Sequence, residues 1–500
     1  MNAARFNFDN SYARLPDRMF ARLEPTPVEQ ARLIKVNHDL AQLLRLDADA
    51  LSTDTGIAVL AGNAIPEGSD PLAMAYAGHQ FGSFNPQLGD GRALLLGEVI
   101  GTDGLRYDIQ LKGSGPTPFS RMGDGRAWLG PVLREYIVSE AMHALGVPTT
   151  RALAAVTTGQ PVYRQEGAYE GALPGAILTR VSRAHIRVGT FQFFSARGDL
   201  EALRVLTDHA IERLYPEAVD AEIPALTLLD AVVAAQASLI AQWMNLGFIH
   251  GVMNTDNCSI AGETIDYGPC AFMDTFHPDQ VFSFIDQQGR YAYRNQPGIA
   301  QWNLANFAQT LLPLISETPE TALEHAQTSV DRFAELFETH HNQGLALKIG
   351  LSELQDGDVD LIGSLLAAMA RNQADFTLLF RGLGQIADPA SDGEADKAVR
   401  DLFVDPTEFD NWAVAWRKRL ASDPRPEPDR KADMLSVNPA IVPRNHLVEA
   451  AIRAAFSEQD YSVFHALTEA LETPFSDPTD PAFSQPPEQS QHVHHTFCGT

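Results

Sequence analysis

Two oxygen-bearing side chains in the middle of the chain have the types and spacing that could hold a metal ion against phosphate. Asn257 follows His250 at short range, and Asp266 comes next, ahead of Tyr267 and Gly268. Carboxylate and amide oxygens are the hard ligands that Mg²⁺ prefers, and Mg²⁺ in such sites also binds substrate phosphates. Asn and Asp cap turns in many proteins, so the pattern is informative as a whole and not through either residue alone.

The spacing resembles a kinase catalytic loop with one position changed. Kinases place a His-Gly-Asp or His-Arg-Asp string here, an Asn five residues after that Asp, and a metal-binding Asp further on. Val252 occupies the position of the kinase aspartate, and the nearest carboxylate is Asp256, beside Asn257. A loop that keeps the metal ligands but displaces the base predicts ATP chemistry of a different kind.

Two charged residues upstream fall where a kinase needs them. Lys112 ends a predicted strand that follows the glycine-rich string Gln87 to Arg92, and Glu135 lies in the next predicted helix, Leu129 to Leu145. In kinases this lysine holds the nucleotide phosphates and this glutamate orients the lysine. Surface lysines and glutamates are commoner in general, but the order of glycine loop, lysine, glutamate and catalytic loop favours a site.

Several arginines could bind phosphate oxygens, because a guanidinium fork matches them. Arg180 ends a predicted strand, and Arg187 follows within the same stretch of chain. Taken individually, Arg183, Arg187 and Arg197 are expected on a solvated face. The string Asp124 to Arg126 offers less to interpret from its residues alone.

Composition limits the class of protein. The chain has 500 residues, and its 37 basic and 64 acidic residues give a formal net charge of −27. Such an acidic chain is a poor binder of DNA or RNA, so no nucleic-acid partner is expected. No window reaches about 18 uninterrupted apolar residues, so we expect no membrane span. Met1 to Pro16 lacks the apolar run of a secretory signal, and the expected location is the cytoplasm.

The three cysteines are Cys258, Cys270 and Cys498. They are too few for a disulfide framework and lack the spacing of zinc ligands. From spacing alone, isolated thiols are the favoured interpretation.

The order of elements predicts an α+β chain with the two-lobed plan of protein kinases, extended at both ends. We expect an N-terminal extension over residues 1–75, a strand-rich lobe over 76–190, a helical lobe over 191–420, and a C-terminal helical segment with an extended tail over 421–500. Hydrophobic periodicity predicts helices over Val28–Leu46, Leu226–Leu246 and His446–Leu471, and strands over Ala93–Ile100, Arg106–Lys112, Ala152–Val156, Pro161–Arg164, Ala176–Val181 and Thr264–Asp266.

Longer strings then give a family resemblance. The chain resembles the selenoprotein O family, a group of kinase-like protein adenylyltransferases. The strings that carry the resemblance are Phe8–Pro16, Tyr76–Gly82, Leu88–Arg92, Gln110–Gly115, the loop over 250–270, Asn438–Pro439, Pro443–His446 and Cys498–Thr500.

The resemblance implies that ATP binds in a flipped orientation relative to kinases, so that AMP is transferred. Asn257 and Asp266 would hold Mg²⁺, with Mn²⁺ as the alternative, Glu135 would pair with Lys112, and Asp256 would accept the proton. The implied nucleotide contacts are Gly89, Gly91, Arg92, Lys112, Asp124, Gly125, Arg180, Arg187 and Asp266.

The acceptors would be Ser, Thr or Tyr hydroxyls of other proteins or of the enzyme itself. The family also links a cysteine after the Asp-Tyr-Gly string to a C-terminal cysteine or selenocysteine, here Cys270 and Cys498, which would make the end of the chain a flexible redox tail. The ending Gly499-Thr500 differs from the Ser-Ser of some members. Two alternatives stay open: a conventional ATP-dependent kinase with Asp256 as base, and a catalytically silent, ATP-binding pseudokinase scaffold.

Overall fold

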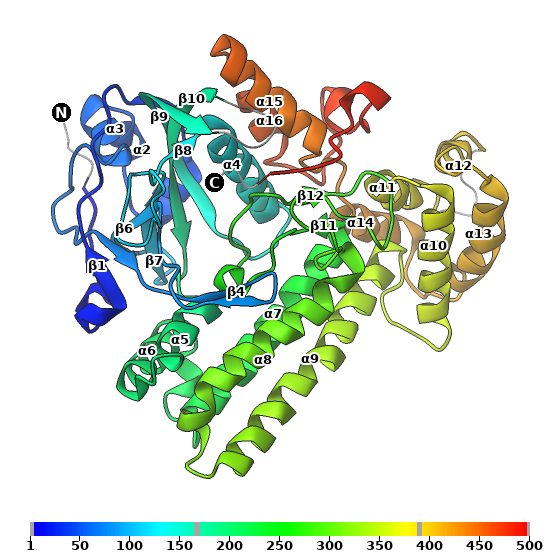
Figure 1. Ribbon diagram of the computed structural model, residues 1–500. Helices are drawn as coiled ribbons and strands as arrows, with labels where there is room; N and C mark the ends of the chain where they lie inside the picture. Colours follow the sequence, from blue (N-terminus) through cyan, green and yellow to red (C-terminus); the bar gives the residue numbers. More distant parts are fainter. Residues whose placement is uncertain (1–4, 165–170, 388–392, 498–500) are drawn as a thin grey trace.

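The computed structural model describes residues 5–164, 171–387 and 393–497, and it combines one large sheet with many helices (Figure 1). The sheet is 8-stranded and antiparallel, in the order β1-β3-β6-β7-β10-β9-β2, with β8 paired to β10. Its strands are β1 (Phe20–Arg22), β2 (Arg32–Val36), β3 (Leu72–Met74), β6 (Ala93–Ile100), β7 (Arg106–Lys112), β8 (Ala127–Trp128), β9 (Arg151–Arg164) and β10 (Gly171–Ser182). The chain is therefore of the mixed α+β class.

Helices cover both faces of this sheet. On one face, α1 (His38–Leu43), α2 (Ala48–Leu51) and α3 (Asp54–Leu60) share an apolar cluster with β6, β7, β9 and β10. On the other face, α4 (Leu129–Ala144) packs on β9 and β10. Two C-terminal helices, α15 (Asn445–Glu458) and α16 (Ser462–Ala470), pack on the outer side of α4 (Figure 1). Burial of the sheet on both faces explains why β6 is apolar almost throughout and does not alternate.

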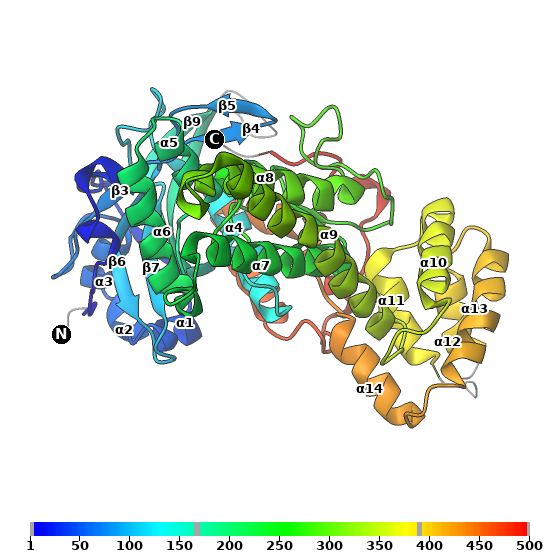
Figure 2. The same ribbon diagram turned by 90° about the horizontal axis from the view of Figure 1, so that it is seen from below.

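The second part of the molecule is helical. Its central helices α7 (Pro224–Leu246), α8 (Gln296–Ile315) and α9 (Pro319–Lys348) lie side by side (Figure 1). Figure 2 shows the yellow and orange helices α10 to α14 at the end of the molecule opposite the sheet. The remaining α-helices are α5 (Val188–Ser195), α6 (Leu200–Leu214), α10 (Asp358–Asn372), α11 (Phe376–Gln385), α12 (Gly393–Arg400), α13 (Pro406–Leu420) and α14 (Glu427–Val437).

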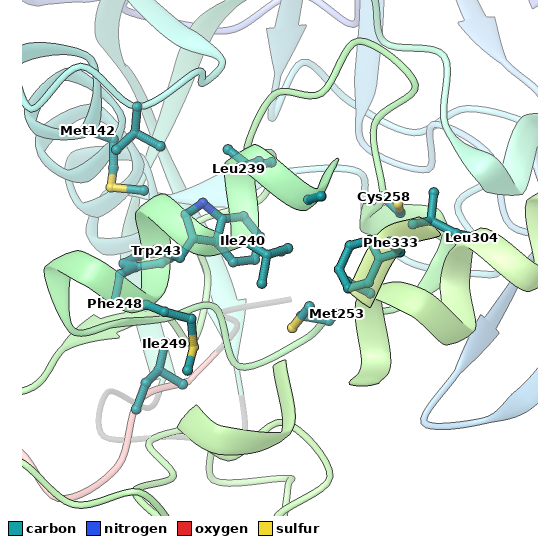
Figure 3. Packing of buried hydrophobic residues seen from close by; sticks show 14 of the residues in the cluster. Met142, Leu239, Ile240, Trp243, Phe248, Ile249, Met253, Cys258, Leu304 and Phe333 are labelled. Carbon is teal, nitrogen blue, oxygen red and sulfur yellow. The ribbon is translucent and has the colours of Figure 1, made fainter. Parts of the chain in front are cut away.

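Helix α7 is the apolar centre of this part. By length and composition it is the one helix among the described residues that could cross a membrane, but its contacts are those of a core helix between α8 and α9. Figure 3 shows Trp243 beside Ile240, Phe248 and Ile249, with Met142 of α4 at one side of the cluster. The Trp243 and Phe248 rings pack edge to face at 5.5 Å. The cluster joins α7 directly to the polar loop that follows it.

A glycine and a short ribbon define that loop. Gly247 ends α7 in the left-handed conformation (φ +70°), which a residue without a side chain adopts at no steric cost. The chain continues into β11 (Phe248–Ile249), which pairs antiparallel with β12 (Ala271–Phe272). Because β11 and β12 pair, the residues between them form a closed loop with a fixed base. A smaller ribbon, β4 (Gly78–Gln80) with β5 (Ser83–Asn85), lies against this loop.

Several element predictions are confirmed and others are wrong. The strands over 93–100 and 106–112, the helix after residue 129 and the long helix ending at Leu246 occur as predicted. The helix predicted over Val28–Leu46 is instead strand β2 followed by α1, because Ile34 and Val36 bury against β9 and Asn37 then caps the helix through Leu40 N. The strand predicted over Thr264–Asp266 is only an isolated bridge between Thr264 and Thr149.

The last predicted helix is two helices, α15 and α16. Their junction is the left-handed residue Gln459, which ends α15. At the start of α15, the Arg444 guanidinium donates to the Asp375 carboxylate at 2.8 and 3.1 Å and also pairs with Asp274. This buried ion group fastens the C-terminal helices to the helical part.

Candidate active site

A cavity of about 450 Å³ lies between the glycine-rich loops of the sheet part and the loop over 250–270. The residues that the resemblance assigns to nucleotide, metal and proton transfer all line it. They are Gly89, Gly91, Arg92, Lys112, Asp124, Gly125, Arg180, Arg187, Asp256, Asn257 and Asp266. Segments far apart in sequence thus bring their polar groups to one place, with Glu135 directly behind Lys112.

A buried ion group forms the inner wall of the cavity. The Lys112 ammonium pairs with the Glu135 carboxylate and lies 3.5 Å from Asp266 Oδ1. On the other side of Glu135, the Arg180 guanidinium lies 3.2 Å from Oε1. Burial alone would raise the pKa of Glu135, but Lys112 and Arg180 hold it below its usual range. Two cations therefore share one fixed carboxylate, and both face the cavity.

His250 holds the loop in shape and takes no visible part in chemistry. It is fully buried, with its ring stacked 5.2 Å from that of Trp243. The Val252 N–H donates to Nδ1 at 3.3 Å, so the proton is on Nε2, which lies 2.9 Å from the Ile265 oxygen. Burial lowers the pKa of His250, which agrees with a neutral ring that bridges the two ends of the loop.

Asn257 and Asp266 have the free oxygen atoms that a magnesium site needs. The Asn257 Nδ2 donates to the Val252 oxygen at 3.0 Å, and this bond uses its nitrogen and leaves its oxygen for a ligand. Asp266 has a left-handed backbone (φ +70°), and its buried Oδ1 has no hydrogen-bond partner among the described residues. Burial alone would raise the pKa of Asp266, but Lys112 and Arg92 hold it well below its usual range. An ionised carboxylate with an oxygen that makes no hydrogen bond fits a divalent cation.

This pair would leave much of the coordination sphere to the substrate. Among residues 5–164, 171–387 and 393–497, no group of three or more His, Cys, Asp or Glu side chains could hold a metal ion. Mg²⁺ is commonly bound by one or two protein oxygens together with waters and substrate phosphates. The donor set therefore fits a metal that arrives with a nucleotide.

Asp256 is a carboxylate of the loop over 250–270 that lines the cavity and could accept a proton. It lies in a 3-10 turn, Thr255–Asn257, and is buried except toward the cavity. The Gln80 side chain donates to Oδ2 at 3.2 Å, whereas Oδ1 has no hydrogen-bond partner in the described chain. Burial raises the pKa of Asp256 to about 6. A pKa near neutrality suits a group that must take up and release a proton.

The glycine loop packs closely against the segment that carries Phe119. A Cβ on Gly89, whose φ is +89°, would stand 2.3 Å from the Phe119 ring, and one on Gly91 would stand 2.9 Å from the Phe119 oxygen. Between them, the Asp90 carboxylate points inward and accepts a 3.1 Å bond from the Met74 N–H. The loop is also tied to the next one, because Thr117 Oγ1 donates to the Asp90 oxygen at 2.7 Å.

The expectation that Arg187 lies on a solvated face is wrong. Its guanidinium is buried, lies 3.5 Å from Asp90 Oδ1 and donates at 3.1 Å to the backbone oxygen of Asp256. The Tyr76 ring packs against it at 4.4 Å. Arg187 therefore connects the glycine loop to the loop that carries the proposed base. By contrast, Arg197 is exposed and rests on Phe193, as predicted.

Asp124 and Gly125 line the outer part of the cavity. Asp124 is exposed and is held by Arg164, whose NH1 donates to Oδ2 at 2.8 Å. Gly125 has a φ of +65°, and a Cβ there would stand 2.1 Å from the Gly115 oxygen. This second loop is closed by its own backbone, and only glycine fits at its base.

Of the predicted cysteine pair, Cys270 and Cys498, the structure describes only Cys270. Cys258 and Cys270 are both buried free thiols, and burial raises the pKa of each to about 12. Neither lines the cavity. Cys498 lies outside the described residues.

Sequence reasoning missed the groups that support the predicted residues. Gln80 bonds to Asp256, Asp90 pairs with Arg187, and Arg164 holds Asp124. Gln80 and Asp90 lie inside the strings Tyr76–Gly82 and Leu88–Arg92. The only available signal for them was the length of those strings.

Comparison with known proteins agrees with this geometry. The family model described as "Protein adenylyltransferase SelO" matches residues 2–472. The chain is 60% identical over 501 residues to the protein nucleotidyltransferase YdiU of Methylorubrum populi, covering 99% of this chain and 100% of that protein. It is 59% identical over 496 residues to the protein of the same name from Bradyrhizobium diazoefficiens, covering 99% of both. The chain belongs to the SelO family.

Membership of the SelO family makes the chain an enzyme of the nucleotidyltransferase class. The family match spans the sheet, the cavity and the helical part, and it ends just after α16. All the cavity residues described above therefore lie inside the matched region.

Proposed function

We propose that this enzyme transfers AMP from Mg-ATP to Ser, Thr or Tyr hydroxyls of proteins, with ATP flipped relative to its orientation in kinases. The observation that carries the proposal is that Val252 and Asp256 occur together in the loop over 250–270 and line the same cavity. An apolar side chain occupies the position of the kinase base, while a buried carboxylate with an unpaired oxygen faces the same cavity. The family match to protein adenylyltransferases supports it independently.

The proposed step is a single displacement at the α-phosphorus of ATP. The acceptor oxygen forms a bond to that phosphorus, the bond to the β-phosphate oxygen breaks, and pyrophosphate leaves. The hydroxyl proton passes to Asp256, whose pKa near 6 lets it act as base around neutral pH. Charge on the phosphate oxygens is met by cations that are already fixed by Glu135 and Asp90, so little reorganisation is needed.

The distribution of charge around the cavity favours the flipped orientation. Lys112 and Arg180 are held at one wall, and Arg187 is held between Asp90 and the Asp256 backbone. Outer phosphates bound by these cations would leave the α-phosphate nearer to the acceptor. Asn257 and Asp266 would hold Mg²⁺, or Mn²⁺ in its place, which would neutralise phosphate charge when bound.

The remaining parts of the proposal follow the family. The two parts of the molecule would correspond to the two lobes of a kinase-like fold, and the protein would act in the cytoplasm. Acceptors would be other proteins or the enzyme itself. Reversible pairing of Cys270 with Cys498 would make the activity respond to redox conditions.

ATP labelled separately at the α- and γ-phosphates tests the central claim. With the full-length enzyme, Mg²⁺ and a mixture of acceptor proteins, label from the α-position should appear on protein, with the mass increase of AMP. Label from the γ-position on protein would instead identify a conventional kinase with Asp256 as base. Tight ATP binding with neither label on protein would identify a pseudokinase scaffold.

A further inference from the structure

One exposed apolar side chain, that of Ile285, lines the cavity, and an exposed pair of phenylalanine rings lies next to it. Ile285 lines the cavity together with Asp256 and Val252, yet 56% of it is exposed. Its neighbour Phe284 is 49% exposed, and Phe497 of the C-terminal tail is 36% exposed. We call Phe284, Ile285 and Phe497 the apolar lip.

The lip is built by pairing two distant segments. Phe284 N–H donates to the Thr496 oxygen at 3.1 Å, and Thr496 N–H donates to the Phe282 oxygen at 2.8 Å. The rings of Phe284 and Phe497 then pack with their centroids 5.0 Å apart. The tail thus supplies part of the lip and also fixes the backbone that carries the rest.

A second set of bonds ties the lip to the catalytic loop. The Asp286 carboxylate accepts the N–H groups of Arg290 and Tyr291 at 2.9 and 2.8 Å, which closes the chain after Ile285 into a compact turn. The Tyr291 hydroxyl donates to Asn254 Oδ1 at 2.6 Å, two residues before Asp256. The lip therefore has a fixed position relative to the proposed base.

A further residue, Phe81, joins the loop of the proposed base to the turn that carries the lip. Phe81 lines the cavity, packs on Tyr291 at 5.1 Å and donates its N–H to Asn254. The glycine loop, Lys112 and Arg180 line the same cavity but belong to the sheet part. The lip and the proposed phosphate-binding groups therefore come from different parts of the molecule.

An exposed apolar patch on a fixed backbone beside an active cavity marks an interaction surface. We propose that the lip binds an apolar side chain of the acceptor polypeptide, next to its reactive hydroxyl. This inference rests on the proposed function. A cavity of about 450 Å³ is roughly 8 Å across, and extended chain spans about 3.3 Å per residue, so the apolar side chain would be two or three residues from the hydroxyl.

The partner that fits is neutral and apolar at this position. Asp279, the other acidic residue on this stretch of loop, already pairs with Arg294 at 2.6 Å, and Asp286 is used by the turn. The three side chains of the lip are themselves uncharged. Aliphatic and aromatic side chains gain most from burial on such a surface.

Peptide selection tests the inference with the enzyme as it exists. Two synthetic peptide libraries, each with one fixed hydroxyl residue, carry either Leu and Phe or only Ser and Gly within three residues of it. Incubated with α-labelled ATP and Mg²⁺, the wild-type enzyme should label the apolar library at least about tenfold faster. Equal labelling of both libraries would overturn the proposed role of the lip in acceptor binding and would leave the proposed function unaffected. No AMP-labelled peptide from either library overturns both.

Single substitutions then test whether the lip residues cause the preference for apolar peptides. Ile285→Ser and Phe497→Ser should each lower the preference several-fold while the affinity for Mg-ATP stays unchanged. Val414→Ser is the matched control, because Val414 is exposed on α13, far along the chain from the cavity residues. Weaker Mg-ATP binding by Ile285→Ser would assign Ile285 to the nucleotide and overturn the inference, as would an unchanged preference in both variants.

Discussion

The Asn257 side chain donates a 3.0 Å hydrogen bond to the backbone oxygen of Val252, the residue that replaces the kinase aspartate. A backbone oxygen can only accept, so the atom that faces Val252 is the amide nitrogen. The carbonyl oxygen of Asn257 is thereby turned to the other side. The position that no longer holds a base thus orients a proposed metal ligand.

This bond predicts that Asp cannot replace Asn257. Asn257→Asp keeps an oxygen ligand, but a carboxylate cannot donate to the Val252 oxygen and repels it. Loss of a partly buried hydrogen bond of this kind costs about 1–3 kcal/mol, so we expect AMP transfer to fall by about 5- to 150-fold. Transfer rates across a magnesium titration are the measurement. Wild-type rates at low magnesium would show that the bond to Val252 is unimportant.

Lys112 and Asp266 should be essential for transfer and dispensable for folding. Lys112→Met and Asp266→Asn preserve side-chain size, so thermal unfolding should remain cooperative while transfer falls by about 100-fold or more, the usual effect of removing a fixed electrostatic group. Lys397→Met is a matched control, because Lys397 is exposed on α12 and pairs with Asp401 at the surface. A folded variant of either residue with wild-type transfer would refute the site.

Asp256 separates binding from chemistry. Asp256→Asn keeps the shape of the side chain and its contact with Gln80, but it cannot take a proton. AMP transfer should therefore fall strongly while Mg-ATP binding, measured by calorimetry, stays within a few-fold of wild type. Asp360→Asn, at an exposed position on α10, is the control. If Asp256→Asn loses nucleotide binding as severely as Asp266→Asn, Asp256 holds the metal or the fold.

The sequence predicted the elements with strong local signals. The helix after Leu129 and the helix ending at Leu246 have apolar periodicity and a glycine at or just after the end, and both occur. Strand β2 was missed because its five residues gain stability only by pairing with β9, which lies far away in the sequence. Local propensity cannot report such a distant partner.

For the candidate site, too, the sequence predicted some features and missed others. Order along the chain was enough to predict that Glu135 pairs with Lys112, whereas the contact of Lys112 with Asp266 comes from the structure. It could not show that Arg187 is buried, since its partners Asp90 and Asp256 come from two other segments. Burial of a charged residue depends on partners that only the folded chain brings together.

Lys348 predicts a pH dependence of stability. It is buried beside the Phe376 and Phe380 rings, and burial lowers its pKa to about 7, from an ordinary lysine value of 10.5. Between pH 10.5 and 7 the unfolded chain takes up a proton that the folded chain does not, so stability falls as pH falls through this window. Below pH 7 both states are protonated and the full cost remains.

Lys348→Met should remove this cost. The free energy of unfolding at pH 6 should rise by up to about 5 kcal/mol, and by much less at pH 10. Urea unfolding at several pH values is the measurement, and Lys418→Met at an exposed site should leave the pH slope unchanged. A Lys348→Met protein with the wild-type slope would show that the lysine stays charged in the folded state.

The last prediction concerns Cys270 and Cys498, which follow the two residues of a contact between the tail and the loop over 250–270. Thr496 Oγ1 donates to the Pro269 oxygen at 2.5 Å, which holds the tail beside the residue before Cys270. Cys498 follows Thr496 by two residues, and Cys270 follows Pro269 by one. Only a few residues of chain therefore separate each cysteine from this contact. Burial raises the pKa of the Cys270 thiol and keeps it protonated, so an oxidant should react first with Cys498. We expect an intramolecular Cys270–Cys498 disulfide under oxidation, opened by thiol reductants, with AMP transfer faster in the reduced form. Non-reducing peptide mapping measures the bond, and Thr496→Val should slow its formation by releasing the tail. Oxidised protein with both thiols free, or with Cys258 as the partner, would contradict the switch and leave the transfer chemistry untouched.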